Sequence, residues 1–207
     1  GLSRHTFEVS DEMRADNRRI YLSFQGVESA YYVYLNGKEV GYSEDSYSPH
    51  RFDITDYLIE GENLLAVKVH KFCDGTWFED QDMIYDGGIF RDVYVTSEPL
   101  VKIEDYTVVT ELDENYENAT LKLSADVRNM SSTDHSGWSI QVKALDEAGE
   151  NLLGDVSIPV SELASAKTGT VEAAIPVTAP KLWSAEHPNL YALVLTLIDG
   201  EGAEVET

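Results

Sequence analysis

The sequence predicts an all-β protein built from two successive β-sandwiches. Short runs of apolar, β-branched and aromatic residues recur along its 207 residues, with Gly, Asn, Asp and Ser between them. No segment shows the 3.6-residue periodicity of a long amphipathic helix. Hydrophobic residues make up 43% of the chain and aromatic residues 10%, as in globular proteins with buried cores. The length is sufficient for two domains.

The first half predicts a jelly-roll β-sandwich. A strand is expected at 20–24, followed by a hairpin whose strands at 30–35 and 38–42 are joined by Asn36-Gly37. Asn-Gly favours a two-residue hairpin turn because both residues tolerate positive φ. One capped helical turn at 53–58 and strands at 64–69 and 89–96 follow. Strands at this spacing are typical of sandwiches and jelly rolls.

The second half predicts an immunoglobulin-like β-sandwich. Strands are expected at 101–110, 119–128, 138–145, 170–175 and 190–198, with at most one helical turn at 161–166. Such a sandwich has about seven short strands in about 100 residues. Cys73 is the only cysteine, so the sandwich contains no disulfide. We expect domains at 1–99, truncated at its N-terminal side, and 100–207, with an unfinished last strand at 203–207.

The net charge of the chain disfavours some classes of binding partner. The formal net charge is −23, and the acidic excess is spread over both halves, with 9 basic and 19 acidic residues in 1–100 and 6 and 19 in 101–207. An anionic surface disfavours nucleic acid and membranes, whose phosphates need Lys or Arg. No apolar run is long enough to span a bilayer, and no signal peptide begins the chain. A neutral sugar remains compatible.

The candidate binding residues lie in one short segment. Glu79-Asp80-Gln81-Asp82-Met83 follows Trp77-Phe78 and precedes Gly87-Gly88. Carboxylates accept hydrogen bonds from sugar hydroxyls, and an aromatic face packs against the C–H side of a pyranose. Nine of the twelve tyrosines also lie before residue 100. The first domain is therefore expected to carry the ligand surface.

The spacing of Asp80 and Asp82 leaves their role open. On one strand their side chains would share a face about 6.6 Å apart. That is near the separation of about 6.5–9.5 Å between the carboxylates of an inverting glycosidase. Neighbours on one strand do not flank a sugar from opposite sides, however. Contact of at least one of them with a ligand or cation is favoured over a self-contained catalytic pair, and a structural or solvated role is the alternative.

Metal-binding motifs are weak. Asp80 and Asp82 fit positions 1 and 3 of a calcium loop, but Ile84 and Tyr85 stand where an oxygen ligand and a glycine are needed. The five histidines are scattered without the spacing of metal ligands. Spacing alone therefore predicts no metal site.

Three other residue types have structural interpretations. Trp77 and Trp183 are expected to pack against the cores, because each can bury a large apolar area. Arg91 lies in an apolar strand context and is expected to be buried in an ion pair with an acid other than Asp92. Cys73 is expected to be a small packing residue rather than a nucleophile.

Several segments resemble glycoside hydrolase family 2, of the long β-galactosidase type. Its sugar-binding jelly roll and immunoglobulin-like domain match here in the same order. The most specific pieces are Glu-Asp-Gln-Asp-Met at 79–83 and Leu-Trp-Ser with Pro-Asn-Leu-Tyr within 182–191. The matching segments are 24–30, 36–42, 52–55, 61–67, 79–83, 88–93 and 180–191.

The resemblance implies an enzyme whose catalytic part lies elsewhere. A barrel after the second domain would supply the two glutamates of a retaining mechanism, so this fragment contains no catalytic residue and is expected to be inactive alone. Asp82 matches the family's aspartate that reaches the active site and touches galactose and a sodium ion. Asp80 and Glu79 match its neighbours and are further substrate-binding candidates. The fragment alone needs no cofactor, whereas the parent would use sodium and, in the barrel, magnesium.

The resemblance also implies partners and a location. A galactoside and the chain's own barrel are the expected partners, in a homo-oligomeric parent in the bacterial cytoplasm. One departure concerns the loop: the family commonly has Trp-Arg after the methionine, whereas this chain has Ile84-Tyr85-Asp86-Gly87. A free-standing carbohydrate-binding or adhesive module without an enzyme is the alternative function.

Overall fold

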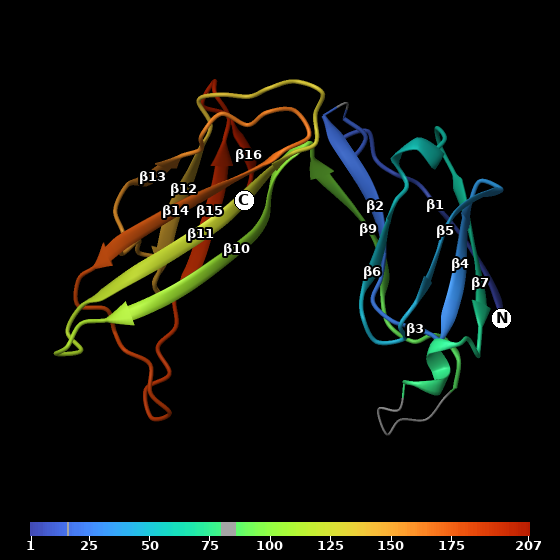
Figure 1. Ribbon diagram of the computed structural model, residues 1–207, viewed down its shortest axis with the longest axis horizontal. Helices are drawn as coiled ribbons and strands as arrows, with labels where there is room; N and C mark the ends of the chain where they lie inside the picture. The colour runs from blue at the N-terminus through green and yellow to red at the C-terminus, as the bar shows by residue number, and fades with distance from the viewer. Residues whose placement is uncertain (16, 80–85) are drawn as a thin grey trace. The chain divides into compact units, whose positions relative to one another are not determined.

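The computed structural model describes residues 1–15, 17–79 and 86–207, in two compact units at Gly1–Glu98 and Pro99–Thr207 (Figure 1). In these residues the only helical elements are two single 3-10 turns, η1 (Thr55–Tyr57) and η2 (Gly75–Trp77). Everything else that is regular is β-strand, so the predicted all-β fold is confirmed. No helix of the described chain is long and apolar enough to cross a membrane.

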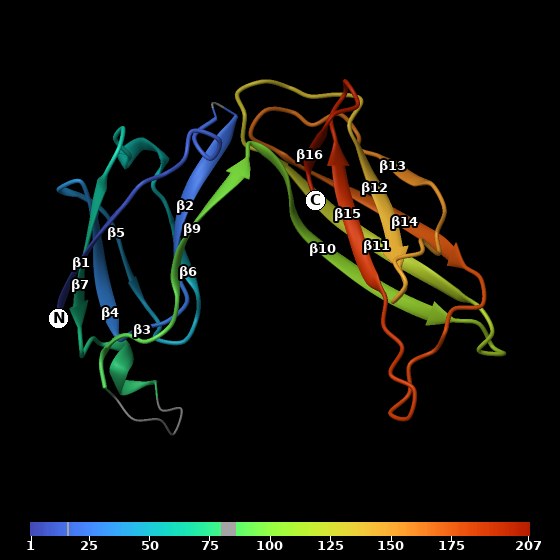
Figure 2. The ribbon, with the colours of Figure 1, turned by 180° about the vertical axis from the view of Figure 1, so that it is seen from behind.

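The first unit is a sandwich whose two main sheets face each other (Figures 1 and 2). One sheet has the order β1-β7-β4-β5 and the other β6-β2-β9, while β3 pairs with β8. The pairs β1–β7, β4–β7, β4–β5, β2–β6 and β3–β8 are all antiparallel. The strands are β1 (Leu2–Phe7), β2 (Arg18–Phe24), β3 (Val27–Glu28), β4 (Ala30–Leu35), β5 (Lys38–Glu44), β6 (His50–Asp53), β7 (Asn63–His70), β8 (Gly88–Ile89) and β9 (Val93–Pro99).

The core of this unit follows from strand alternation. Every second residue of β7, from Leu65 to Val69, is buried, as expected for a strand with one face on the core. Phe24 lies at the centre, 1% exposed, with its ring centroid 4.9 Å from that of Tyr31 and 6.1 Å from that of Phe52. Tilted and edge-on aromatic contacts of this kind add to the stabilisation from burial.

The predicted Asn-Gly hairpin is confirmed. Asn36 and Gly37 have φ values of 52° and 80°, and β4 pairs with β5 directly across them. The Asn36 side chain also ties this turn to β7, because its Oδ1 accepts from Leu64 N and its Nδ2 donates to Asn63 Oδ1, both at 2.9 Å. Asn63 is fully buried, so these hydrogen bonds satisfy a polar group in the interior.

The strand predicted at 89–96 is instead two strands, β8 and β9, interrupted at 90–92. The chain turns there because Gln25 N donates to Asp92 O, and Phe90 lies so close to Gly26 that a Cβ at Gly26 would be 2.7 Å from its Cζ. Arg91 is exposed, and its Nη1 donates to Gln25 O and Tyr47 O. Among the described residues it contacts carbonyls and aromatic rings, so the predicted burial of Arg91 is wrong, while its predicted ion pair with an acid stays a prediction.

The second unit is a seven-stranded sandwich of two sheets, β10-β11-β14 and β13-β12-β15-β16. Its strands are β10 (Val101–Leu112), β11 (Ala119–Asn129), β12 (Ser139–Leu145), β13 (Val156–Pro159), β14 (Thr168–Val177), β15 (Ala192–Ile198) and β16 (Glu204–Glu206). This is the strand number of the predicted immunoglobulin-like domain. In β11, alternate residues from Leu121 to Val127 are buried between the sheets.

Two segments of the second unit refine the expectations. The possible helical turn at 161–166 is absent; Leu163, 1% exposed, instead forms a β-bridge with His135. The last residues form β16, which pairs with β15, and Glu206 Oε2 accepts a hydrogen bond from Ile103 N at 2.8 Å. This bond joins the edges of the two sheets.

The turn between β10 and β11 predicts a local acid sensitivity. Asp113 accepts from Asn115 N, Glu117 N, Asn118 N and Asn118 Nδ2, and these bonds, that from Glu117 first, lower its pKa from the ordinary value of 3.8. Since the folded pKa is the lower one, the bonds stabilise the turn fully above 3.8 and are lost as the pH falls through the folded value. We expect the Glu117 and Asn118 amide NMR signals to shift there. The Asp113→Asn variant should lack this transition; an unchanged one would assign it to another acid.

Candidate functional site

The segment with the predicted carboxylates is only partly described. Asp80 and Asp82 lie outside the described residues, whereas Glu79 is the last described residue before them and Asp86 the first after. The structure therefore shows what holds the two ends of this segment, and the roles predicted for Asp80 and Asp82 stay predictions.

The first end is fixed by Glu79. Its Oε1 accepts from Ser46 N at 3.2 Å and its Oε2 from Ser46 Oγ at 2.7 Å. Ser46 is completely buried, so Glu79 satisfies two donors that water does not reach. Both carboxylate oxygens of Glu79 are thus used within the protein. This contact gives Glu79 an anchoring role, and its contact with a sugar stays a prediction.

The turn that carries Ser46 is itself well defined. Asp45 has a φ of 79°, and its Oδ1 accepts from Tyr47 N and Ser48 N, both at 3.3 Å. A hydrogen bond from the Ser48 side chain, together with these two backbone bonds, lowers the pKa of Asp45. Aspartate is suited to this position because it tolerates the left-handed region and bonds to the backbone two residues on. Glu79 therefore accepts its hydrogen bonds from a residue, Ser46, that lies in a rigid turn.

Aromatic rings are exposed beside Glu79. Local hydrogen bonds stabilise the turn η2. Cys73 N donates to Thr76 Oγ1 at 3.0 Å, and Phe78 N donates to Gly75 O at 2.9 Å. Trp77 and Phe78 are each 89% exposed. The predicted burial of Trp77 is wrong, because the tight turn directs the ring outward. Exposed rings next to carboxylates are the combination that favours sugar binding.

The second end is fixed by Glu28, which sequence analysis missed. Gly87 N donates to Glu28 Oε2 at 2.7 Å, and Glu28 is 4% exposed. Its Oε1 is buried and has no hydrogen-bond partner in the described structure. A glutamate within the apolar run at 27–35 was the available signal, since a buried charge needs a specific partner. Ser46 offered no such signal.

One group of side chains close to the first end, beside Glu79, could bind a cation. Ligand atoms of Glu44, Cys73 and Asp74 lie within 4.8 Å of one another. Cys73 is half-buried, with its Sγ 3.5 Å from Thr76 Oγ1, so it packs within the turn as expected. Burial and the neighbouring Glu44 raise the pKa of Tyr42. No other observation among the described residues points to an ion here.

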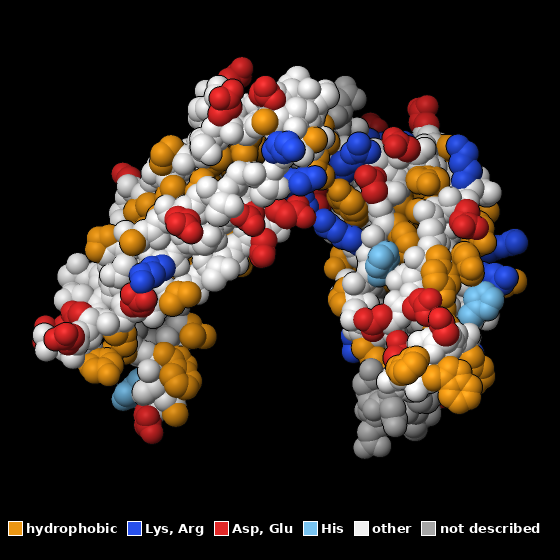
Figure 3. Space-filling model, in the orientation of Figure 1, with side chains coloured by type: hydrophobic (Ala, Val, Ile, Leu, Met, Phe, Trp, Pro, Cys, Tyr) orange, Lys and Arg blue, Asp and Glu red, His pale blue; other side chains and the backbone are white. Residues whose placement is uncertain are grey.

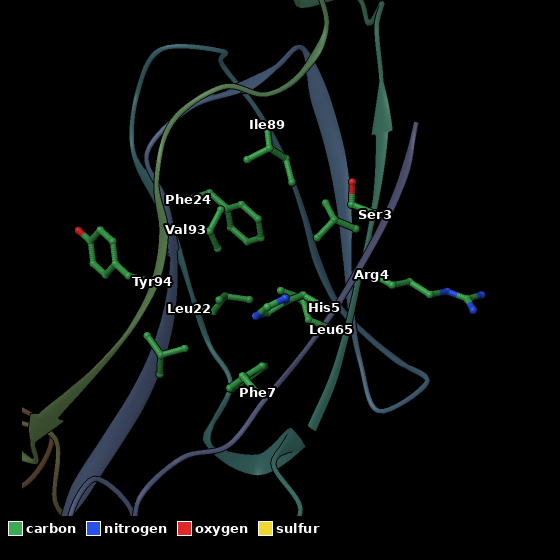
Figure 4. A pocket seen from close by; sticks show the side chains of 12 residues that line it. Ser3, Arg4, His5, Phe7, Leu22, Phe24, Leu65, Ile89, Val93 and Tyr94 are labelled. Carbon is green, nitrogen blue, oxygen red and sulfur yellow. The ribbon is translucent and has the colours of Figure 1, made fainter. Parts of the chain in front are cut away.

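The first unit also contains an apolar cleft, with a cavity volume of about 240 Å³ (Figure 4). It lies between edge strands β1 and β9, where Phe24, Leu65 and His5 point into the space, while Arg4 and Tyr94 point away. The residues that line it in the described part of the chain include no carboxylate. They therefore lack the oriented polar groups that a sugar site needs.

A variant tests the anchoring role of Glu79. Glu79→Gln keeps the shape but leaves one acceptor oxygen, so one Ser46 donor loses its partner, at a cost of about 1–3 kcal/mol. We expect faster hydrogen exchange at the Ser46 amide. The control is Glu60→Gln, an exposed glutamate of the same unit. Equal Ser46 exchange in wild type and both variants would contradict the anchor.

Comparison with known families and proteins agrees with this description. Residues 1–99 match the family described as "Glycosyl hydrolases family 2, sugar binding domain", and residues 101–207 match "Glycosyl hydrolases family 2". The chain is 44% identical to a β-galactosidase of Priestia megaterium over 98% of its length, and 40% identical to one of Clostridium acetobutylicum over 97%. It spans only 19% and 21% of those two proteins.

Solved structures share the fold. A Bacteroides uniformis β-glucuronidase superimposes with a TM-score of 0.81 at 24% identity, and a putative β-galactosidase from Bacteroides fragilis with 0.79 at 22%. Each match covers 99% of this chain, and 25% and 31% of the respective structure. The chain therefore belongs to glycosyl hydrolase family 2, of which it contains the sugar-binding domain followed by the immunoglobulin-like domain.

Proposed function

We propose that the chain is the non-catalytic, N-terminal part of a β-galactosidase that hydrolyses terminal β-D-galactosides in carbohydrate metabolism. The observation that carries the proposal is the 44% identity, over nearly the whole chain, to a β-galactosidase. Because the chain spans about a fifth of that relative, the activity belongs to the longer protein. A galactoside, the catalytic barrel of the parent and further copies of the parent are the proposed partners.

In this proposal the first unit contributes Asp82 to the substrate pocket. The hydrogen bonds Glu79–Ser46 and Glu28–Gly87 support it, because they fix both ends of the segment that carries Asp82 through buried side chains. A binding group held by rigid neighbours loses little entropy when it binds a ligand. Trp77 and Phe78 add exposed aromatic surface beside it.

The chemical roles divide between this chain and the parent. Two glutamates of the barrel would act as acid/base and nucleophile in a retaining mechanism. Asp82 would accept a hydrogen bond from a sugar hydroxyl, and its carboxylate oxygen is the ligand type that hard cations such as sodium prefer. Magnesium would be held by the barrel.

Turnover of a chromogenic β-galactoside tests the division of roles. We expect none with the 207-residue chain and turnover with a longer chain that includes the barrel, because the opposed carboxylates that hydrolysis needs lie outside this chain. The matched control for contamination is the Glu79→Gln/Asp80→Asn/Asp82→Asn variant of the 207-residue chain. Turnover by the unmodified chain above this control would contradict the proposal. A longer chain that binds galactosides without hydrolysing them would instead support a carbohydrate-binding module.

A further inference from the structure

The sheet β6-β2-β9 of the first unit carries a polar cleft with a volume of about 280 Å³. The cleft lies on the outer face of the sheet. Neighbouring residues of a strand point to opposite faces, so the buried Leu22 and Phe24 leave Ser23 and Gln25 facing outward. Figure 3 shows basic, acidic and histidine side chains close together on the side of the unit that this sheet forms.

All three strands contribute to the cleft. Strand β6 adds Arg51, which is paired with Ser23 of β2, and β9 adds the alternate residues Tyr94, Thr96 and Glu98. Figure 4 shows Tyr94 pointing away from the apolar cleft between β1 and β9, as its place on the outer face requires. The strand alternation thus brings polar residues from distant parts of the chain to one surface.

Two side-chain pairs hold the walls of the cleft in place. The Arg51 guanidinium donates to Glu98 Oε1 and lies 4.4 Å from the centroid of the Tyr21 ring. Gln25 Nε2 donates to Tyr94 Oη at 2.9 Å. Side chains that are already ordered lose little entropy when a ligand binds, so the cleft is suited to binding.

The cleft still offers hydrogen-bonding groups and an aromatic face. Tyr94 is 45% exposed. Ser23 is 6% exposed, and its hydroxyl bonds to no other side chain in the described part of the structure. Arg51 has five N–H donors, and the Gln25 amide oxygen is an acceptor. A ligand could therefore contact a ring while exchanging hydrogen bonds in both directions.

These groups favour a small neutral ligand rich in hydroxyls. Every described residue that lines the cleft, except Pro49, has a hydrogen-bonding side chain, and an apolar ligand would leave those groups without partners. Arg51 is paired with Glu98, and the chain has a net charge of −23, so an anion gains little attraction. The volume is near the lower limit of about 300 Å³ for ligand pockets, which suits one or two sugar rings.

The exposed aromatic surface of the second unit has a different character. Trp183 is 63% exposed, so its predicted burial is wrong, and Leu190 is 70% exposed. The groove that they border has no acidic side chain among its described lining residues, and Asn189 and Tyr191 bond to backbone nearby. An exposed ring flanked by available donors and acceptors distinguishes the β6-β2-β9 cleft from this groove.

We propose that the β6-β2-β9 cleft is a binding site for a neutral pyranoside. The Tyr94 ring packs against the C–H side of the sugar, and Ser23, Gln25 and Arg51 bond to its hydroxyls. None of the residues that line the cleft belongs to the segment 79–87. The site is formed by the first unit alone, so it does not depend on the activity of a longer chain.

NMR titration of the 207-residue chain with methyl β-D-galactoside tests the site. We expect saturable shifts of the Gln25, Arg51 and Thr96 amide signals, with a Kd on the order of 1 mM, as for a few hydrogen bonds and one ring contact. Tyr94→Ala and Gln25→Ala should each raise the Kd about fivefold or more. Tyr106→Ala is the matched control, since Tyr106 is 57% exposed on β10, and it should leave the Kd unchanged.

Four outcomes would overturn the proposal. These are the absence of saturable shifts at the cleft, saturable shifts confined to residues 76–79, an unchanged Kd in both cleft variants, and binding of methyl β-D-glucuronide as tight as that of the neutral galactoside. Saturable binding at the cleft of a longer chain that hydrolyses no β-galactoside would uphold the site and contradict the proposed function. Hydrolysis by a longer chain whose cleft binds no sugar would do the reverse.

Discussion

Asp82→Asn, in a longer chain that includes the catalytic barrel, is expected to lower kcat/KM for a β-galactoside by about one to two decades. The change keeps the size of the side chain but removes its charge and turns one acceptor into a donor. A charged hydrogen bond to a ligand is worth about 1.5–3 kcal/mol, and about 1.4 kcal/mol corresponds to a factor of ten. Weaker sodium binding should add to the loss.

The measurement is kcat/KM across a sodium titration for wild type, Asp82→Asn and Asp80→Asn. Asp80→Asn serves as the neighbouring control and should cost less activity. Thermal stability should change little in either variant, because a ligand-facing carboxylate is not part of the core. Full activity with unchanged sodium dependence in Asp82→Asn would show that Asp82 is only a surface or structural acid.

The largest expected effect on stability comes from Phe24→Ala. Phe24 is 1% exposed and contacts the rings of Tyr31 and Phe52, so its removal leaves a cavity between the sheets. Such truncations cost about 3–5 kcal/mol in free energy of unfolding. Phe72→Ala is the matched control, because Phe72 belongs to the same unit and is 68% exposed.

Denaturant unfolding, followed by hydrogen exchange in strands β2 and β4, separates the first unit from the second. We expect a large loss of protection there in Phe24→Ala and almost none in Phe72→Ala. If the two variants lose similar amounts, Phe24 is not a central packing residue.

The elements that sequence analysis predicted correctly have strong local signals. The hairpin at Asn36-Gly37 forms because both residues tolerate positive φ. Strands β7 and β11 bury every second residue, and the apolar residues of their sequences occupy those buried positions. β1 was missed because five of its six residues are exposed and it carries no apolar alternation. The four-residue strands β6 and β13 are too short for a periodic signal. The break between β8 and β9 depends on contacts with Gly26 and Tyr47, which are distant in the sequence.

The candidate site likewise contains residues that local sequence signals identify and residues that only the folded structure reveals. Glu79 could be singled out because it lies in a dense run of carboxylates, but its partner Ser46 is 33 residues away, and Glu28 is 59 residues from Gly87. Contacts at such separations depend on the completed fold. The two tryptophans were predicted to be buried because of their large apolar area; they are exposed because hydrogen-bonded turns present them.

The paired anchors at Glu79 and Gly87 have a consequence for evolutionary change in this family. Their partners, Ser46 and Glu28, belong to other parts of the sandwich. Because these anchors lie outside the stretch 80–86, we expect exchanges within it, such as at Ile84-Tyr85-Asp86, to change sugar selectivity more than thermal stability. Swapping this stretch between relatives, with sugar selectivity and thermal midpoint both measured, would show whether the two properties can be altered separately.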